Sequence, residues 1–224
     1  MLEHYMSQFA VIGLGRFGLA ASIELMRLGN SVIGVDSDSK LVNTVSEQLT
    51  VAAIADATDE SSLKELDIGS CDAVLVAIGE SLEASILCVL LLKSLNVKEI
   101  WVKATTKPHH IILTKLGVSR IIHPEEEIGV RVAQSLNYPM MNQYMPIGNG
   151  LFIVEVEIKS HHPNMSVKKL LGKAGKDIEP MLVRRNSTII KHIDGDFQLA
   201  VKDSLILSGS LAALKKIAPE FYAK

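Results

Sequence analysis

The chain has 224 residues, of which 48% are hydrophobic, and its formal net charge is −2. This length predicts a domain of ordinary size together with a smaller one, and the hydrophobic fraction is sufficient for a sizeable core. A long Lys/Arg block and a basic helix-turn-helix segment are both missing, which argues against a DNA-binding repressor or another nucleic-acid-binding protein.

Signals for targeting and redox chemistry are weak. The first residues are polar, so we expect no secretory signal peptide. The longest apolar run, residues 86–92, is far shorter than the ~20 residues of a membrane span. We therefore expect a cytoplasmic chain that reaches a membrane through a partner. Cys71 and Cys88 are not spaced as metal ligands, and we expect both to be reduced thiols.

The first predicted strand runs directly into a glycine turn. Residues 9–12 form an apolar run, Gly13, Gly15 and Gly18 follow in G-x-G-x-x-G spacing, and a helix is expected over 17–28. In such a turn the glycines permit a tight bend, close approach of a pyrophosphate, and close packing of helix on strand. Arg16 adds a fixed positive charge inside the turn, which indicates a ligand with more phosphate charge than a dinucleotide has.

Further strands alternate with helical segments through the first part of the chain. This alternation, with right-handed crossovers, predicts an α/β, doubly wound, Rossmann-like parallel sheet over residues 8–137. The expected strands cover residues 31–35, 51–55, 73–78, 100–103 and 120–122, and helices are expected after Asp38, Asp59, Ser81, Pro108 and His123.

The helix expected over residues 81–95 is apolar on nearly every side. Such a helix needs cover on more than one face. We expect one face of this helix to pack against the sheet and another face to pack against the second domain or another subunit. We favour a subunit interface.

The pattern changes after residue 137. Residues 138–150 contain Pro139, Pro146, Gly148 and Gly150 and are predicted to be a linker. Alternating strands at 151–158, 181–185 and 188–192, an apolar strand at 205–207 and short helices at 166–171 and 211–217 then predict a small α+β C-terminal domain over 151–224.

Ligands of doubly wound sheets bind beyond the carboxyl ends of the strands. Asp36 stands about 20 residues past the glycine turn, where an acid accepts from the ribose hydroxyls and disfavours NADP. Lys103 suits phosphate, and a carboxylate such as Glu125 beside phosphates indicates a bridging cation. The candidate ligand-binding residues are Gly13, Gly15, Arg16, Phe17, Gly18, Asp36, Ser37, Asp38, Asp56, Ala57, Thr58, Ile78, Gly79, Glu80, Lys103, Ala104, Thr105, His109 and Glu125.

Each of these residues also has an ordinary structural interpretation. Asp36, Asp38 and Asp56 are suitable caps and turn residues, Lys103 is a suitable solvated charge, and Glu125 suits the dipole of the helix that it opens. Their placement at one edge of the sheet is what favours a binding site. No nucleophile with its base is apparent, so we expect no catalytic residues.

These motifs together identify a family resemblance. The chain closely resembles the Ktr-type cytosolic regulators of potassium uptake. The resemblance rests on the run from Phe9 to Gly18, on the strand tips at residues 35–36, 55–58, 76–79 and 100–104, and on the segment 120–125. These are RCK (regulator of potassium conductance) proteins of the TrkA family, in which a nucleotide-binding domain precedes a TrkA-C-like domain.

The resemblance implies a homo-octameric ring of dimers, peripheral on the inner face of the cell membrane, that docks under a KtrB-like membrane potassium translocator. Each nucleotide domain would bind ATP or ADP, with ATP favouring the active ring. Arg16 would reach a γ-phosphate, in relatives from the neighbouring subunit, Lys103 and His109 would lie near the phosphates, and Glu125 would help to hold Mg²⁺ or Na⁺.

Two functions thus compete. One is a non-enzymatic ATP/ADP-sensing regulator of a potassium translocator. The other is an NAD(H)-dependent oxidoreductase or NADH sensor, because the glycine turn and Asp36 fit both. Arg16 and Glu125 favour the first.

Overall fold

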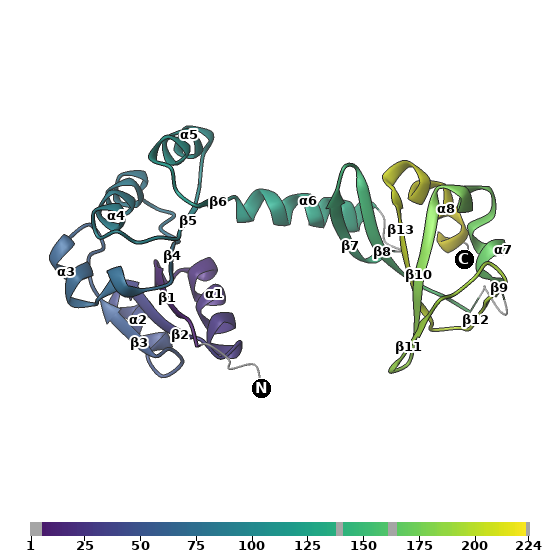
Figure 1. Cartoon of the computed structure of the whole chain (residues 1–224), viewed down its shortest axis with the longest axis horizontal. Coiled ribbons are helices and arrows are strands. Elements are labelled where there is room, and N and C mark those ends of the chain that lie inside the picture. Colours follow the sequence, from purple (N-terminus) through teal and green to yellow (C-terminus); the bar gives the residue numbers. More distant parts are fainter. Residues whose placement is uncertain (1–5, 138–140, 161–164, 223–224) are drawn as a thin grey trace. The chain divides into compact units, whose positions relative to one another are not determined.

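A computed structural model describes residues 6–137, 141–160 and 165–222. It divides into two compact units, Met1–Glu125 and Glu126–Lys224 (Figure 1). Among the described residues, no helix combines the length and the apolar character needed to cross a membrane.

The first unit is built on a six-stranded sheet whose strand order is β3-β2-β1-β4-β5-β6, with every neighbouring pair parallel. This order confirms the predicted doubly wound sheet, and it reverses between β1 and β4. The strands are β1 (Gln8–Ile12), β2 (Ser31–Asp36), β3 (Val51–Ile54), β4 (Ala73–Val76), β5 (Ile100–Lys103) and β6 (Arg120–Ile122).

Helices connect these strands. Those after Asp38, Asp59 and Ser81 begin where the sequence predicts them, whereas the helix predicted after Pro108 begins one residue before it, at Lys107, with Thr106 as its cap. Asp38, Asp59, Ser81 and Thr106 each accept a hydrogen bond from a backbone amide in the first turn of the following helix. The helices are α1 (Arg16–Arg27), α2 (Ser39–Val45), α3 (Glu60–Glu65), α4 (Leu82–Ser94), α5 (Lys107–Leu116) and α6 (Pro124–Asn137), with a 3₁₀ turn η1 at Ile68–Ser70.

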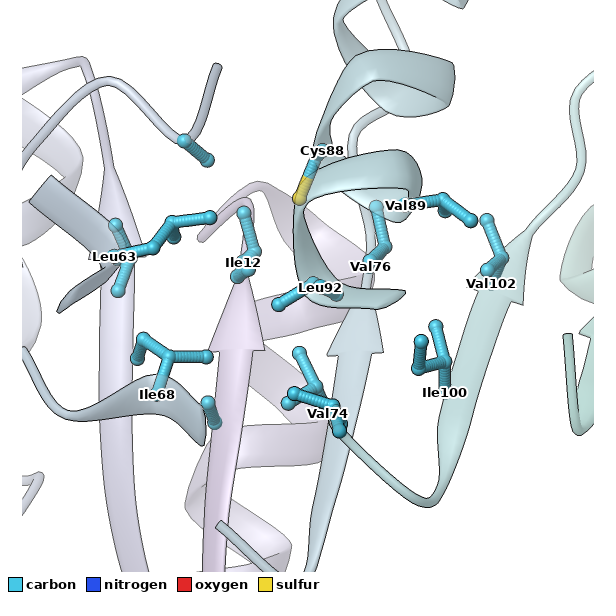
Figure 2. Packing of buried hydrophobic residues seen from close by; sticks show 14 of the residues in the cluster. Ile12, Leu63, Ile68, Val74, Val76, Cys88, Val89, Leu92, Ile100 and Val102 are labelled. Carbon is cyan, nitrogen blue, oxygen red and sulfur yellow. The ribbon is translucent and has the colours of Figure 1, made fainter. Parts of the chain in front are cut away.

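Two apolar layers hold the sheet between its helices. On one side, Cys88, Val89 and Leu92 of α4 point down onto side chains of the strands, including Val76 and Val102 (Figure 2). A second cluster joins Val11, Leu14 and Val32 to buried side chains of α2. Burying each such side chain contributes about 1.5–3 kcal/mol, so the strand tips rest on a rigid base.

The strand predicted over residues 73–78 ends two residues earlier, at Val76. The Ala77 amide donates a hydrogen bond to the Ile12 carbonyl at 2.7 Å, so the hydrogen bonding between β4 and β1 extends one residue beyond the end of β4. Ile78 and Gly79 therefore belong to a loop at the sheet edge, where their backbone is open to a ligand.

The second unit is a small α+β structure, as predicted. Its five-stranded sheet has the order β11-β10-β13-β8-β7 with antiparallel pairs, and β9 and β12 form a separate two-stranded ribbon. The elements are β7 (Met141–Gly148), β8 (Leu151–Glu157), β9 (Met165–Ser166), α7 (Val167–Leu171), η2 (Gly172–Lys176), β10 (Ile178–Arg185), β11 (Thr188–Lys191), β12 (Gln198–Leu199), β13 (Ser204–Ser210) and α8 (Leu211–Tyr222). Their inner faces share one core, which includes Val154, Leu170, Val183, Leu205 and Leu214.

The linker predicted over residues 138–150 is wrong for most of its length. Met141–Gly148 forms β7, which pairs with β8 through a turn at Asn149 and Gly150, and residues 138–140 lie outside the described part of the chain. Pro146 is tolerated because β7 is an edge strand with irregular register at this point. We therefore propose that the second domain begins before β7 rather than at residue 151.

Candidate functional site

The three glycines of the first turn stand in three different environments. Gly13 has a φ of +96°, and a Cβ there would lie 3.0 Å from the backbone carbon of Ala77. A Cβ at Gly18 would lie 1.8 Å from the Gly13 carbonyl oxygen, whereas one at Gly15 would meet nothing within 4 Å. The first and third glycines thus allow close packing, and the second leaves the start of α1 open.

A hollow of about 330 Å³ lies beside this turn, at the carboxyl ends of β1 to β4. It occupies the edge at which the strand order reverses, where doubly wound sheets bind their ligands. Eleven of the predicted residues line it, namely Gly13, Gly15, Asp36, Ser37, Asp38, Asp56, Ala57, Thr58, Ile78, Gly79 and Glu80.

Seven further residues, which the sequence did not predict, line the hollow. Four directly precede predicted positions at the strand tips, so extending each tip by one residue would have found Ile12, Val35, Ala55 and Ala77. The other three come from the starts of α2 and α4, namely Leu41, Ser81 and Ala84. The sequence marks Ser81 as the start of a helix but does not mark any of the three as a ligand-binding residue.

Asp36 connects the tip of β2 to the glycine turn. Its Oδ2 accepts a hydrogen bond from the Leu14 amide at 2.6 Å, and its Oδ1 accepts one from the Asp38 amide at 2.8 Å. A carboxylate has about four acceptor sites, so both oxygens retain capacity for hydroxyl donors. The position suits a cis-diol, such as that of an unmodified ribose.

Asp56 shapes the wall of the hollow after β3. Its Oδ1 accepts from the Thr58 hydroxyl at 2.7 Å and from the Thr58 amide at 2.8 Å. These two hydrogen bonds lower the pKa of the Asp56 carboxyl below its ordinary value. The carboxylate is therefore ionised at neutral pH and fixes the loop that carries the buried Ala57.

A charged cluster lies just outside the hollow, next to Gly79. Lys103 Nζ forms an ion pair with Glu125 Oε1 at 2.6 Å and lies 5.9 Å from the centre of the Phe17 ring. A Cβ at Gly79 would be 3.6 Å from the same Nζ atom. The Lys103 side chain is only 14% exposed, so its ammonium group is held in place.

Arg16 contributes to the electrostatics of this cluster. The hydrogen bond from Lys103 is the main cause of the lowered pKa of Glu125, and the positive charges of Lys103 and Arg16 lower it further. Arg16, Phe17 and Lys103 do not line the hollow itself. Instead, Arg16, Lys103 and Glu125 form a charged extension beyond it, on the side of the glycine turn.

The remaining predicted residues are not brought to the hollow. Ala104 is buried in the core of the first unit, Thr105 lies in the following loop, and Gly18 packs against Gly13. His109 is 1% exposed, its Nδ1 faces the Thr105 amide at 3.4 Å, and its Nε2 has no partner. Burial and the nearby His123 lower the pKa of His109, so it is neutral.

A preformed metal centre is not present in the part of the chain that the structure describes, because no group of three or more His, Cys, Asp or Glu side chains has suitable geometry. Glu125 can nevertheless supply one carboxylate oxygen. Mg²⁺ is often held by one or two carboxylates together with ligand phosphates and water. The donor set therefore fits a cation that arrives with a polyphosphate.

Comparisons with known proteins agree with this fold. The model of the TrkA-N domain family matches residues 9–124. The chain is 37% identical over 213 residues to "Ktr system potassium uptake protein A" of Bacillus subtilis (strain 168), covering 95% of this chain and 96% of that protein. It is 35% identical over 202 residues to the protein of the same name from Vibrio alginolyticus, covering 90% of this chain and 92% of the relative.

A solved structure described as the GsuK channel bound to NAD resembles the chain in fold. The TM-score is 0.56 at 17% identity, and the match covers 98% of this chain but 39% of the channel chain. At that identity the likeness concerns the fold alone.

Proposed function

This chain belongs to the TrkA-N domain family and is similar to Ktr potassium-uptake proteins along nearly its whole length, and from this premise we propose that it is an ATP/ADP-sensing regulatory subunit of a potassium uptake system. Its role is to gate a membrane K⁺ translocator through a nucleotide-dependent change of a protein ring, without catalysis. One observation supports ATP and ADP in particular. It is the charged extension of Arg16, Lys103 and Glu125 beyond a hollow of nucleoside size.

The proposed binding mode assigns a role to each part of the edge. Asp36 accepts from the ribose hydroxyls, the loop of Asp56 and Ala57 borders the base, and the amides at the start of α1 receive phosphates. Arg16 and Lys103 then supply positive charge for the terminal phosphate. An added phosphoryl group brings negative charge to the place where the positive charges of Arg16 and Lys103 already lower the pKa of Glu125.

Glu125 is proposed to hold Mg²⁺ or Na⁺ when the polyphosphate is bound. Lys103 now neutralises Glu125, and a phosphate is a competing anion for the same ammonium group. Attraction of Lys103 to the phosphate leaves the carboxylate free for a cation. The cation supplies charge neutralisation only.

Energetics favour an assembly over a single subunit. One charge-assisted hydrogen bond contributes ~1.5–3 kcal/mol, whereas switching an equilibrium from mostly off to mostly on takes ~5.5 kcal/mol of differential binding. A terminal-phosphate contact in one subunit falls short of this value. Several coupled subunits, each contacting the same phosphate, reach it.

Exposed apolar surfaces supply the contacts for such an assembly. Leu87 and Leu90 of α4 are 42% and 45% exposed, and Ile128, Val132 and Leu136 form a stripe of exposed side chains four residues apart on α6. These surfaces are proposed to join subunits in a homo-octameric ring of dimers. The ring would lie in the cytoplasm against a KtrB-like translocator.

An NAD(H) sensor is the second candidate, because Asp36 suits the unmodified ribose of NAD as well as that of ATP. A dinucleotide, however, carries no terminal phosphate for Arg16 and Lys103. Isothermal titration calorimetry with ATP, ADP and NADH, each with and without Mg²⁺, separates the two functions.

The decisive variant is Arg16→Ala, which we expect to lower affinity for ATP by about 10- to 100-fold, from the ~1.5–3 kcal/mol of a charge-assisted contact, and to affect ADP less. Arg27→Ala is the matched control, because Arg27 is an exposed arginine of the same helix that pairs with Glu24. Equal losses for ATP and ADP, or tighter binding of NADH than of either, would overturn the proposal.

A further inference from the structure

A second hollow, of about 210 Å³, lies in the C-terminal unit where α7, η2 and α8 meet. Three lysines line it, Lys169, Lys173 and Lys216, and the described lining includes no acidic side chain. The other lining residues are apolar or glycine, namely Leu170, Leu171, Gly172, Ala174 and Ile217. The nucleotide site plays no part in this surface, because it lies in the other unit.

The charge around the hollow is strongly one-sided. Residues 167–176 carry four lysines and no acid, although the whole chain has a net charge of −2. Asp177 approaches Lys216 only to 4.0 Å, and their side chains are 61% and 64% exposed. An ion pair that is so well solvated neutralises little. The surface therefore presents concentrated positive charge to a partner.

The lysines stand on a firm apolar base. Leu170, Leu171 and Ile217, which line the hollow, are at most 5% exposed and belong to the core of this unit. The ammonium groups thus project from elements fixed by packing, while their methylene stems cover apolar surface. Lys168 lies apart from this rim, because its side chain packs beside Gly195.

We infer that this lysine-rimmed hollow docks onto an anionic phospholipid bilayer, with a headgroup phosphate among Lys169, Lys173 and Lys216. Basic clusters are attracted to anionic leaflets with a strength that grows with each lysine near the surface. Nucleic acid is the weaker match, because the described lining offers no aromatic side chain for base stacking.

This inference goes beyond the proposed function, since it gives the chain a membrane contact of its own that needs no translocator. The test uses the full chain and vesicles of phosphatidylcholine alone or with one-third phosphatidylglycerol, and it measures the bound fraction by co-sedimentation. The test variant combines Lys169→Gln, Lys173→Gln and Lys216→Gln. The control combines Lys159→Gln, Lys191→Gln and Lys202→Gln, which remove the same charge from exposed positions elsewhere in the unit.

We expect binding to the anionic vesicles only, weakened by salt, and roughly 100-fold weaker for the test variant than for the control. Equal binding by the two variants, or equal binding to neutral vesicles, would overturn the inference. Calorimetry with ATP on the same variants keeps the two proposals separate. Loss of vesicle binding by the test variant with unchanged ATP affinity supports the membrane contact. Failure of the wild-type chain to bind ATP would concern only the nucleotide proposal.

Discussion

Arg185 and Asp203 show how single residues fix the second unit. Arg185 donates from Nε and one terminal nitrogen to the two Asp203 oxygens, each at 2.8 Å, and Asp203 Oδ2 also accepts from the Ala200 amide at 2.7 Å. The Asp203 side chain is only 1% exposed. A carboxylate so deeply buried is stable as long as these donors surround it.

Replacing Asp203 tests this arrangement. We expect Asp203→Asn to lower the free energy of unfolding by about 2–4 kcal/mol at neutral pH, because it leaves a partly buried guanidinium without its counter-charge. Chemical denaturation measures the loss. Asp196→Asn, at an exposed site in a nearby turn, is the control and should change stability little.

The same variant carries a pH prediction. Burial raises the pKa of Asp203, but the hydrogen bonds from Arg185 and the Ala200 amide outweigh it, and the net pKa lies below the ordinary value of 3.8. Stabilisation by this carboxylate is therefore complete above the unfolded pKa and is lost as the pH falls through the lower folded pKa. The stability gap between wild type and Asp203→Asn should shrink over that acidic range, and a gap independent of pH would contradict the prediction.

At the scale of elements, α4 illustrates how one helix serves two surfaces. Cys88, Val89 and Leu92 are fully buried against the sheet (Figure 2). Leu87 and Leu90 on the same helix remain exposed in the single chain. Since α4 is apolar on nearly every side, the sequence indicates that two surfaces cover the helix. It does not indicate which side chains of α4 face the sheet and which face the second surface.

Substitutions on the two faces of α4 should therefore have different effects. Leu87→Ser with Leu90→Ser should weaken subunit association, measured by sedimentation velocity, without a matching loss of secondary structure in circular dichroism. Leu92→Ala should instead lower stability by about 2–5 kcal/mol, because it opens a core cavity. Ile189→Ser, an exposed position on β11 in the other unit, controls for the loss of a surface hydrophobe. Unchanged association of the Leu87 and Leu90 variant would remove α4 from the proposed interface.

At the scale of the whole molecule, the two units have separate cores. The clusters of the first unit lie on both sides of its parallel sheet, and the cluster of the second lies under its antiparallel sheet. Each unit can thus unfold as its own cooperative element.

Calorimetric unfolding should accordingly show two transitions. ATP at 100 times its dissociation constant should stabilise the first unit by about 2.7 kcal/mol and raise the midpoint of its transition only. Arg16→Ala at the same ATP concentration should reduce the shift. A single transition that moves as a whole would indicate that the units unfold together.

The sequence by itself determined the parallel sheet, the glycine turn and most of the hollow's rim. Those features follow from local rules: strand period, helix caps, glycine spacing, and the convergence of parallel strand ends at one edge. The tip residues Asp36, Asp56 and Gly79 could be located in this way because each directly follows a strand predicted from the sequence.

Only the tertiary structure decided the features that depend on pairing between distant segments. It made β7 from a segment whose Pro146 and Gly148 indicate a linker, because β8 supplies hydrogen bonds that outweigh weak local preference. It buried His109 away from the hollow, and it set Lys103 between Gly79, Phe17 and Glu125. Side-chain direction and neighbours arise from packing across the fold, and one-dimensional patterns do not contain that information.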